Sequence, residues 1–164
     1  MKYPLVVAIT GASGAPYSVR LLEVLLRNQV PVHLTISPSG AQVIAQELNR
    51  FVNLEDFDVT SLLGLNDSTA FDTSSLTYHN YKDYFTPIAS GSFRTEGMVV
   101  APCSGSTLSG IVASLTRHPS IRPMASIGCS RINHSVAINQ YLRQFDCRSY
   151  NPFPPSVISL LKKR

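Results

Sequence analysis

The sequence lacks tryptophan and carries few charges. Charged residues make up 15% of its 164 residues, and the formal net charge is +4. The basic residues are scattered, apart from a cluster at Lys162–Arg164, and no basic stripe with interleaved aromatic residues occurs. This composition argues against a nucleic-acid partner.

Cysteines are also few, and their placement excludes two classes of protein. Cys103, Cys129 and Cys147 are odd in number and lack the spacing of metal ligands. The sequence therefore predicts neither a disulfide framework nor a metal site, but reduced thiols in the cytoplasm. Cys103 itself is expected to be a small buried residue, because the sequence offers no base partner for a nucleophilic thiol.

Long apolar runs are missing as well. No segment approaches the ~20 apolar residues that a membrane-spanning helix needs. The short run Leu5–Ile9 enters a glycine loop too soon for a signal peptide. Hydrophobic residues nonetheless make up 44% of the chain, an ordinary globular content. Length and composition thus predict a single domain over residues 1–164, with no membrane span.

What the sequence does contain is a strand, a small-residue loop and a helix in immediate succession. Leu5–Thr10 (LVVAIT) has the pattern of a buried strand, Gly11–Ala15 (GASGA) follows at once, and a helical pattern starts at Val19. Backbone N–H groups and the positive end of the helix dipole meet in such a turn, which makes it an anion site. The sequence thus predicts a phosphorylated ligand of the nucleotide-cofactor type.

The same alternation continues along the chain. Val30–Ser37 predicts a second strand and Ser39–Leu48 a second helix. Met98–Ala101 predicts a further buried strand, and Thr107–Ser114 the helix after it. Strands that alternate with helices are typical of a parallel sheet covered by helices. We therefore expect a three-layer α/β fold with a mainly parallel, doubly wound sheet.

Two stretches lack this pattern. Asn49–Asp83 is acidic and rich in Ser and Thr, and it predicts a surface excursion with one short helix near Val59–Leu65. Beyond Ser114, prolines interrupt the chain and the periodicity fades, so residues 115–164 predict no long regular element.

The glycine loop admits a dinucleotide-binding interpretation, which two features oppose. Ala15–Tyr17 stand where the third glycine of the fingerprint belongs, and the second strand ends at Ser37 rather than at an acidic residue for an adenine ribose. Tyr78 and Lys82 match a Tyr-x-x-x-Lys catalytic pair, but they lie early in the chain in a loop-like stretch, which favours chance. An NAD-dependent reductase is a disfavoured alternative.

Ser, Thr and Gly recur in the turns that follow strand-like runs. These turns are Gly11–Ala15, Ser37, Ala89–Ser92 and Pro102–Thr107. In a doubly wound sheet such turns can gather at the carboxyl edge, where their hydroxyls and amides would hold one phosphate and a polar ring edge. Each turn, considered alone, is explained equally well as an ordinary Ser/Gly turn that binds no ligand.

In this order and spacing, the motifs resemble the flavin prenyltransferases of the UbiX type. The resemblance covers about residues 3–114 and rests on Thr10–Ala15, Arg20–Glu23, His33–Ser37 with Glu47, Ala89–Met98 and Pro102–Leu108. The motif Pro102–Thr107 favours this branch over the related flavin-dependent cysteine decarboxylases. We accordingly expect one flavoprotein domain of flavodoxin- or Rossmann-like fold, with residues 1–114 as the family-like core and 115–164 as a divergent tail.

The resemblance implies a reaction and its partners. Members of the family transfer a dimethylallyl group from dimethylallyl phosphate to reduced FMN, with new bonds at flavin N5 and C6. They need no metal, and their prenylated FMN serves UbiD-type decarboxylases. They form homo-oligomers with the site at subunit contacts. Because the tail departs from the family, an FMN-binding module or pseudoenzyme without transferase activity stays open as the alternative.

Carried over by position, the resemblance also assigns residues. The FMN-binding residues would be Gly11, Ala12, Ser13, Gly14, Ser37, Ser90, Ser92, Ser104 and Thr107. Ser13 and Glu47 would be catalytic at the reacting ring edge, because ring closure at C6 requires a proton to leave. Alternatively, Glu47 is a solvated helix residue and Ser13 caps the helix that follows it.

Other residues receive roles from their position. Counted along the chain from Thr107, Arg122 falls at about the position of an arginine in the family. It is therefore a candidate to bind the substrate phosphate, although its neighbours differ from the family. His33 is expected to be a strand residue packed in the sheet rather than a catalyst. Arg94 and Glu96 are expected to be surface or subunit contacts.

Overall fold

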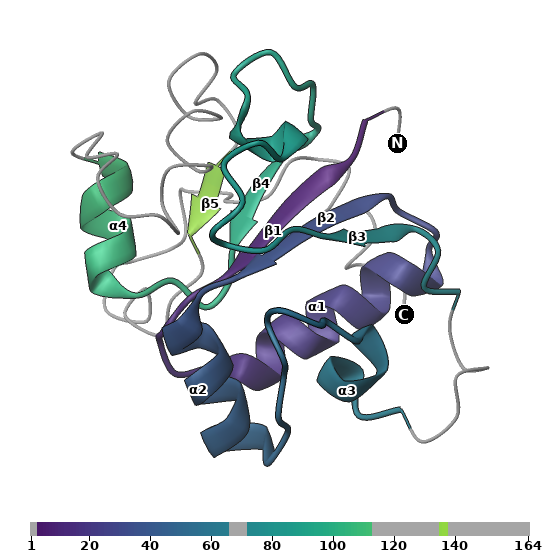
Figure 1. The fold of residues 1–164 in the computed structure, drawn as a ribbon, viewed down its shortest axis with the longest axis vertical. Helices are drawn as coiled ribbons and strands as arrows, with labels where there is room; N and C mark the ends of the chain where they lie inside the picture. Colours follow the sequence, from purple (N-terminus) through teal and green to yellow (C-terminus); the bar gives the residue numbers. More distant parts are fainter. Residues whose placement is uncertain (1–2, 66–71, 113–134, 138–164) are drawn as a thin grey trace, which may run out of the picture.

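The centre of the molecule is a parallel sheet, as the alternation of strands and helices predicts. The computed structural model describes residues 3–65, 72–112 and 135–137. Its strands are β1 (Leu5–Ile9), β2 (Val32–Ile36), β3 (Leu76–Tyr78), β4 (Gly97–Val100) and β5 (Ser135–Ala137). They form one sheet in the order β3-β2-β1-β4-β5, with all neighbours parallel (Figure 1).

Helices and a long crossover cover the sheet. The described helices are α1 (Ala15–Arg27), α2 (Pro38–Leu48), α3 (Val59–Leu63) and α4 (Gly105–Val112), together with the 3₁₀ turn η1 (Pro87–Ala89). We use the term crossover for residues 79–96, which connect β3 to β4 and include η1 (Figure 1).

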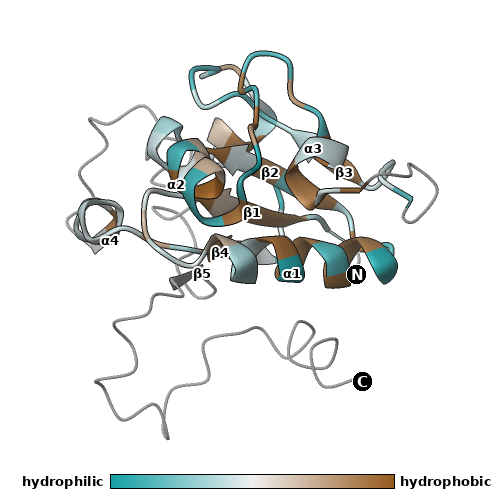
Figure 2. Ribbon diagram, turned by 90° about the horizontal axis from the view of Figure 1, so that it is seen from below, coloured by the Kyte–Doolittle hydropathy of each residue, from teal (hydrophilic) through white to brown (hydrophobic). Residues whose placement is uncertain are grey.

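The two faces of β1 separate two apolar clusters. Leu5, Val7 and Ile9 point to one face, where they pack with buried residues of α1, α2 and α3. Val6 and Ala8 point to the other face, where Ile88 of η1 and Ile111 of α4 contribute. Side chains alternate along a strand, so a run that is apolar throughout marks a strand buried on both faces. Figure 2 shows β1 as an almost wholly apolar ribbon, whereas α1 has polar and apolar patches. This confirms the three-layer α/β fold.

The helix starts differ from the prediction for a local reason. α1 begins at Ala15, four residues before Val19, and α2 begins at Pro38 rather than at Ser39. Pro16 and Pro38 lie in the first turns of these helices, where a missing N–H costs nothing and the fixed φ suits the helix. Proline here marks a helix start and does not delay it.

Three short elements were not predicted from the sequence. β3 falls inside the stretch expected to be a surface excursion, η1 falls before the Ser90–Ser92 turn, and β5 falls in the tail. β3 and β5 have three residues each, and so short a run shows no measurable period. In the excursion, the short helix near Val59–Leu65 is confirmed as α3.

The strand order defines where a ligand can bind. β1 leads to β2 and β3 on one side, whereas β4 and β5 lie on the other side. The order therefore reverses between β1 and β4. In open parallel sheets, ligands bind outside the carboxyl ends of the strands at such a switch point. The turns after β1 and β4 flank this position.

Candidate functional site

The turns after β1 and β4 are joined by hydrogen bonds through Thr10. The Thr10 hydroxyl donates to the Pro102 carbonyl oxygen (2.8 Å) and accepts from the Ser104 amide (2.8 Å). The Thr10 amide also donates to the Pro102 carbonyl, at 3.1 Å. Thr10 is 2% exposed, so these bonds fix the two turns to each other at the switch point. This role of Thr10 was not predicted, although Thr10 opens the TGASG motif.

The turn after β2 packs so closely against the end of β1 and the turn that follows it that glycine is required at two positions. A Cβ on Gly11 would lie 2.4 Å from Ser39 Cβ, and a Cβ on Gly40 would lie 2.7 Å from the Ile9 carbonyl oxygen. Ser37 caps α2 by accepting a hydrogen bond from the Gly40 amide at 3.0 Å. Three of the four predicted turns therefore meet at the carboxyl edge.

Glu47, near the end of α2, reaches back to the start of α1. Its Oε2 accepts hydrogen bonds from the amides of Ala15 (2.8 Å) and Gly14 (3.0 Å), and its Oε1 accepts from Gly14 at 3.2 Å. The Ser13 hydroxyl donates to the same carboxylate. The sequence predicted these amides as donors to a ligand phosphate, but in the structure they hold the Glu47 carboxylate.

The contacts keep Glu47 ionised. Desolvation raises its pKa, but the hydrogen bonds from Ser13, Gly14 and Ala15 together outweigh desolvation, so the pKa lies below its usual value. The carboxylate also faces the positive end of the α1 dipole. The Glu47 carboxylate is therefore held beside the Ser13 hydroxyl at the start of α1, although the residue itself is exposed.

The alternative role for Ser13, as the cap of α1, is wrong. The cap position is Gly14, which has a φ of 118° and offers no side chain. An L side chain rarely adopts this conformation, which favours glycine. Ser13 is left exposed at the tip of the turn, with its hydroxyl bound to Glu47. Ala12 precedes it in the same turn.

Hydroxyl groups gather at the start of α4. The Ser104 Oγ lies 2.8 Å from Thr107 Oγ1 and 3.1 Å from Ser106 Oγ, and it accepts from the Thr107 amide at 3.3 Å. Among the described residues, a Cβ placed on Gly105 would meet no atom within 4 Å. Ser104 and Thr107 thus lie together at the switch point, with Thr107 buried.

The fourth turn lies elsewhere in the same chain. Ser90 and Ser92 precede β4, whose first residue Gly97 pairs with Leu5 at the amino end of β1. The Ser90 and Ser92 hydroxyls bond to each other at 2.9 Å, and both side chains are exposed. The expectation that all four turns gather at the carboxyl edge is wrong for this one, because the crossover has to return to the amino edge before β4 begins.

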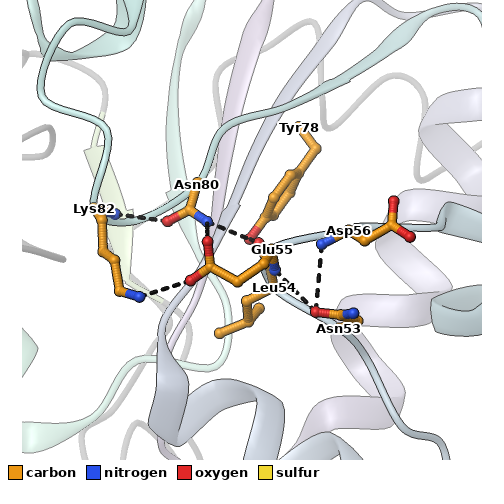
Figure 3. A network of polar contacts seen from close by, with 7 residues as sticks. All are labelled: Asn53, Leu54, Glu55, Asp56, Tyr78, Asn80 and Lys82. Carbon is orange, nitrogen blue, oxygen red and sulfur yellow. Dashed lines mark hydrogen bonds and ion pairs between the residues drawn. The ribbon is translucent and has the colours of Figure 1, made fainter.

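Tyr78 and Lys82 are occupied by a structural network (Figure 3). The Tyr78 hydroxyl donates to the Leu54 carbonyl at 3.1 Å, and Asn80 Nδ2 donates to the same oxygen at 2.9 Å. Lys82 Nζ lies 2.6 Å from Glu55 Oε1. Burial, with smaller contributions from nearby acidic groups, raises the pKa of Tyr78. Tyr78 therefore ties the stretch after α2 to β3, Lys82 ties it to the crossover, and the two do not form a catalytic dyad.

Two further expectations can be compared with the structure. Cys103 is fully buried in the apolar cluster with Val6 and Ala8, and burial raises the pKa of its thiol to about 11. The expectation of a small buried residue is confirmed. Among the residues described, no group of three His, Cys, Asp or Glu side chains could hold a metal ion, and no helix is long and apolar enough to cross a bilayer. Arg122 lies outside the described residues.

Comparison with known proteins agrees with the fold and the motifs. The family model for flavoproteins matches residues 1–127. The chain therefore belongs to the flavoprotein family. Within that family it is UbiX-like, as its motifs predicted.

The curated relatives include flavin prenyltransferases UbiX from several organisms. The protein of Halalkalibacterium halodurans is 39% identical over 105 residues, which are 64% of this chain and 48% of the relative. The protein of Escherichia coli K12 is 42% identical over 113 residues, which are 68% of this chain and 51% of the relative. The chain thus spans about half the length of these relatives.

Two solved structures share the fold. The crystal structure of AnUbiX (PadA1) in complex with FMN and dimethylallyl pyrophosphate matches with a TM-score of 0.65 and 26% identity, over 98% of this chain and 71% of the other. A dodecameric FMN-dependent UbiX-like decarboxylase from Escherichia coli O157:H7 matches with a TM-score of 0.63 and 28% identity, over 96% of this chain and 72% of the other.

Proposed function

We propose that this chain is a flavin prenyltransferase, which binds reduced FMN at the carboxyl edge of the sheet and transfers a dimethylallyl group to it from dimethylallyl phosphate. The names of the curated relatives support the reaction. The ligands in the AnUbiX crystal structure support the two substrates. The single observation in this chain that carries the proposal is the Glu47 carboxylate, held beside Ser13 at the switch point.

The residues present at this edge fit a flavin. Gly11 lets the first turn pack closely against Ser39, and Ser37, Ser104 and Thr107 add hydroxyl groups from two other turns. Because Glu47 occupies the amides at the start of α1, the FMN phosphate is expected at the turns after β2 and β4. Helix starts with free amides and hydroxyls suit a phosphate.

Glu47 and Ser13 would manage the proton. Reduced FMN, when bound, supplies the nucleophilic N5 and C6 atoms that accept the dimethylallyl group. Closing the ring at C6 releases a proton, and an ionised carboxylate can accept it directly or through the Ser13 hydroxyl. The Gly14 and Ala15 amides keep the carboxylate in place. Arg122 is proposed to bind the substrate phosphate.

A second copy of the chain would complete the site. Ser90 and Ser92 bind each other on the crossover, away from the turns at the carboxyl edge. Phe85 of the same crossover is 99% exposed and Tyr84 is 42% exposed. Exposed aromatic side chains favour a protein contact. We propose a homo-oligomer in which the crossover of one copy brings Ser90 and Ser92 to the flavin of another, and a UbiD-type decarboxylase as the recipient of the product.

The test is anaerobic incubation of the full chain with reduced FMN and dimethylallyl phosphate, followed by mass analysis of the flavin. The expected product is a flavin heavier by one prenyl unit. FMN that is bound but unmodified would overturn the transferase and leave the alternative, an FMN-binding module without transferase activity. Hydride transfer from a nicotinamide, without flavin binding, would instead revive the reductase interpretation.

A further inference from the structure

Two histidines join the crossover to the face of the sheet. His33 lies on β2 and His79 is the first residue of the crossover, directly after β3. His33 Nδ1 and His79 Nε2 are 2.6 Å apart. The ring planes differ by 17° while the centroids are 4.8 Å apart. A short nitrogen distance with distant centroids means that the rings meet edge to edge, which suits an N–H···N hydrogen bond.

The second nitrogen of His79 is bonded too. Its Nδ1 makes a short hydrogen bond with the Thr86 hydroxyl, and the His79 amide donates to the Leu34 carbonyl at 2.8 Å. His79 is 9% exposed and Thr86 is 4% exposed. A continuous row of three side chains therefore links β2 to the residue just before η1.

His33 also contacts the far end of the same stretch. The Phe93 ring lies 5.1 Å from the His33 ring, centroid to centroid, at an angle of 56°. Phe93 directly follows Ser92, and its amide donates to the Ser90 carbonyl at 3.1 Å. One imidazole thus touches the beginning and the end of the stretch that carries Ser90 and Ser92.

The hydrogen bond between the rings limits how many protons the pair can hold. One facing nitrogen must carry a proton and the other must be bare. The pair keeps this bond when it gains one proton, since one facing nitrogen stays bare. It loses the bond when both rings are cations, because two N–H groups then point at each other beside two like charges.

We propose that His33 and His79 are positioning residues, which hold the crossover against the sheet and thereby set the position of the Ser90–Ser92 turn, and that acid releases this hold. The effect of this position on FMN binding rests on the proposed function. The contact of the crossover with the sheet through the two histidines does not depend on that function.

Among the residues that the structure describes, few charges lie near the two histidines. Asp83 of the crossover raises the pKa of His79. Burial, and then the charge of His33, lower it more strongly, to about 4. Burial also lowers the pKa of His33. Thr77, the neighbour of His33 on β3, is uncharged. The other side chains on this face of β1 and β4 are apolar, namely Val6, Ala8, Met98 and Val100, and Cys103 stays protonated.

The sign of the pH dependence follows from these shifts. The pKa of His79 is lower in the folded chain than the ordinary value of about 6.5 expected when it is unfolded. Acid therefore favours the state in which the histidines are solvated. The hold is complete above pH about 6.5 and is lost as the pH falls toward about 4.

The experiment compares the full chain with His33→Gln, His33→Leu and Lys82→Met. A glutamine side chain in place of His33 can still donate or accept toward His79 but cannot become a cation, whereas a leucine side chain can do neither. Lys82→Met removes a different tie of the same crossover and serves as the matched control. Two readouts are followed from pH 7.5 to 4.0: the backbone amide NMR shifts of Ser90 and Ser92 without ligand, and the affinity for FMN.

In the unsubstituted chain and in Lys82→Met, we expect the two amide shifts to move with acid and FMN binding to weaken. In His33→Gln both profiles become shallower and move to lower pH, because His79 then gains its proton without a second cation beside it, while affinity at pH 7.5 stays within about threefold. In His33→Leu, affinity at pH 7.5 falls roughly tenfold, the loss of about one buried hydrogen bond. The titration of the FMN phosphate is common to all variants and cancels in the comparison.

Failure of this proposal and failure of the proposed function look different. If the Ser90 and Ser92 shifts in His33→Gln keep the acid response of the unsubstituted chain, the histidine hold is wrong, whether or not FMN binds. If the shifts behave as expected but no variant binds FMN at any pH, the hold stands and the proposed function is wrong.

Discussion

The Glu47 carboxylate occupies the N-terminus of α1 through the Ala15 amide, with 2.8 Å between Oε2 and N. An acidic side chain from another helix thereby replaces the cap that Gly14 cannot supply. Such a contact fixes the ends of α1 and α2 to each other and leaves the charge at the candidate site. The same atoms therefore stabilise the fold and, under the proposed function, would supply the proton acceptor.

Glu47→Gln separates these two roles. The amide oxygen of glutamine can still accept from Ala15, so FMN affinity should change by less than about threefold. Glutamine cannot accept the proton, so dimethylallyl transfer should slow by 10²-fold or more, the usual contribution of a general base (~10²–10⁴-fold). Rapid-quench measurement of flavin prenylation under anaerobic conditions gives the rate. Unchanged turnover would remove Glu47 from the mechanism.

The control for that variant is Glu23→Gln on the outer part of α1. Glu23 pairs with Arg20 at 2.8 Å, and the Arg20 side chain is 68% exposed. A change in turnover in Glu23→Gln equal to that in Glu47→Gln would mean that general loss of negative charge, rather than proton acceptance at Glu47, explains both.

Gly40→Ala should destabilise the fold. Its new Cβ would lie 2.7 Å from the Ile9 carbonyl oxygen, which belongs to the central strand and cannot move easily. Overpacking of this kind costs ~1–3 kcal/mol. Denaturant unfolding measures it. Gly105→Ala is the matched control, because its Cβ meets no atom within 4 Å, and a comparable loss there would refute the steric explanation.

Tyr78→Phe tests whether the Tyr78 and Lys82 pair has any catalytic part. The phenol hydroxyl donates to the Leu54 carbonyl, which keeps a second donor in Asn80. The free energy of unfolding should fall by ~0.5–1.5 kcal/mol, while the prenylation rate at saturating substrates stays the same. A fall in that rate without a fall in stability would show that the structural assignment of Tyr78 is wrong.

Cys103 should be unreactive in the folded chain. Its thiol is buried, and burial raises its pKa to about 11, so at neutral pH almost none of it is thiolate, the reactive form. Labelling with iodoacetamide at pH 7.5, followed by peptide mass analysis, should modify Cys103 only after denaturant is added. Prompt labelling of Cys103 in the native chain would contradict the burial described for the cluster around Val6.

The core of the fold could be predicted from the sequence because its signals are local. β1 is apolar at every position, and the loop from Gly11 follows it directly, so strand, turn and helix are readable in order. β3 could not be predicted, because it is held by its neighbours: Val32, His33 and Leu34 pair with its residues. A segment of three residues is too short to show a periodicity of apolar residues, and its pairing with a strand distant in sequence is not visible in its own residues.

For the candidate site, too, the local motifs could be predicted from the sequence and the long-range contacts could not. Sequence motifs indicated Ser13 and Glu47, but only the folded chain reveals that Glu47 binds the amides of α1 and that Ser90 lies away from the carboxyl edge. The direction in which the crossover returns across the sheet is a property of topology, not of the residues in the turn. The contact between His33 and His79 joins residues 46 positions apart, which no motif spacing indicates.

The outer strand β3 has a consequence for how the protein behaves at high concentration. An exposed strand edge can recruit the backbone of another molecule, and long, flat edges do so most readily. β3 offers only Leu76–Tyr78, and the chain turns away after it through His79 and Asn80, which are bonded to Leu34 and Leu54. So short an edge leaves little template for strand-by-strand aggregation on that side of the sheet.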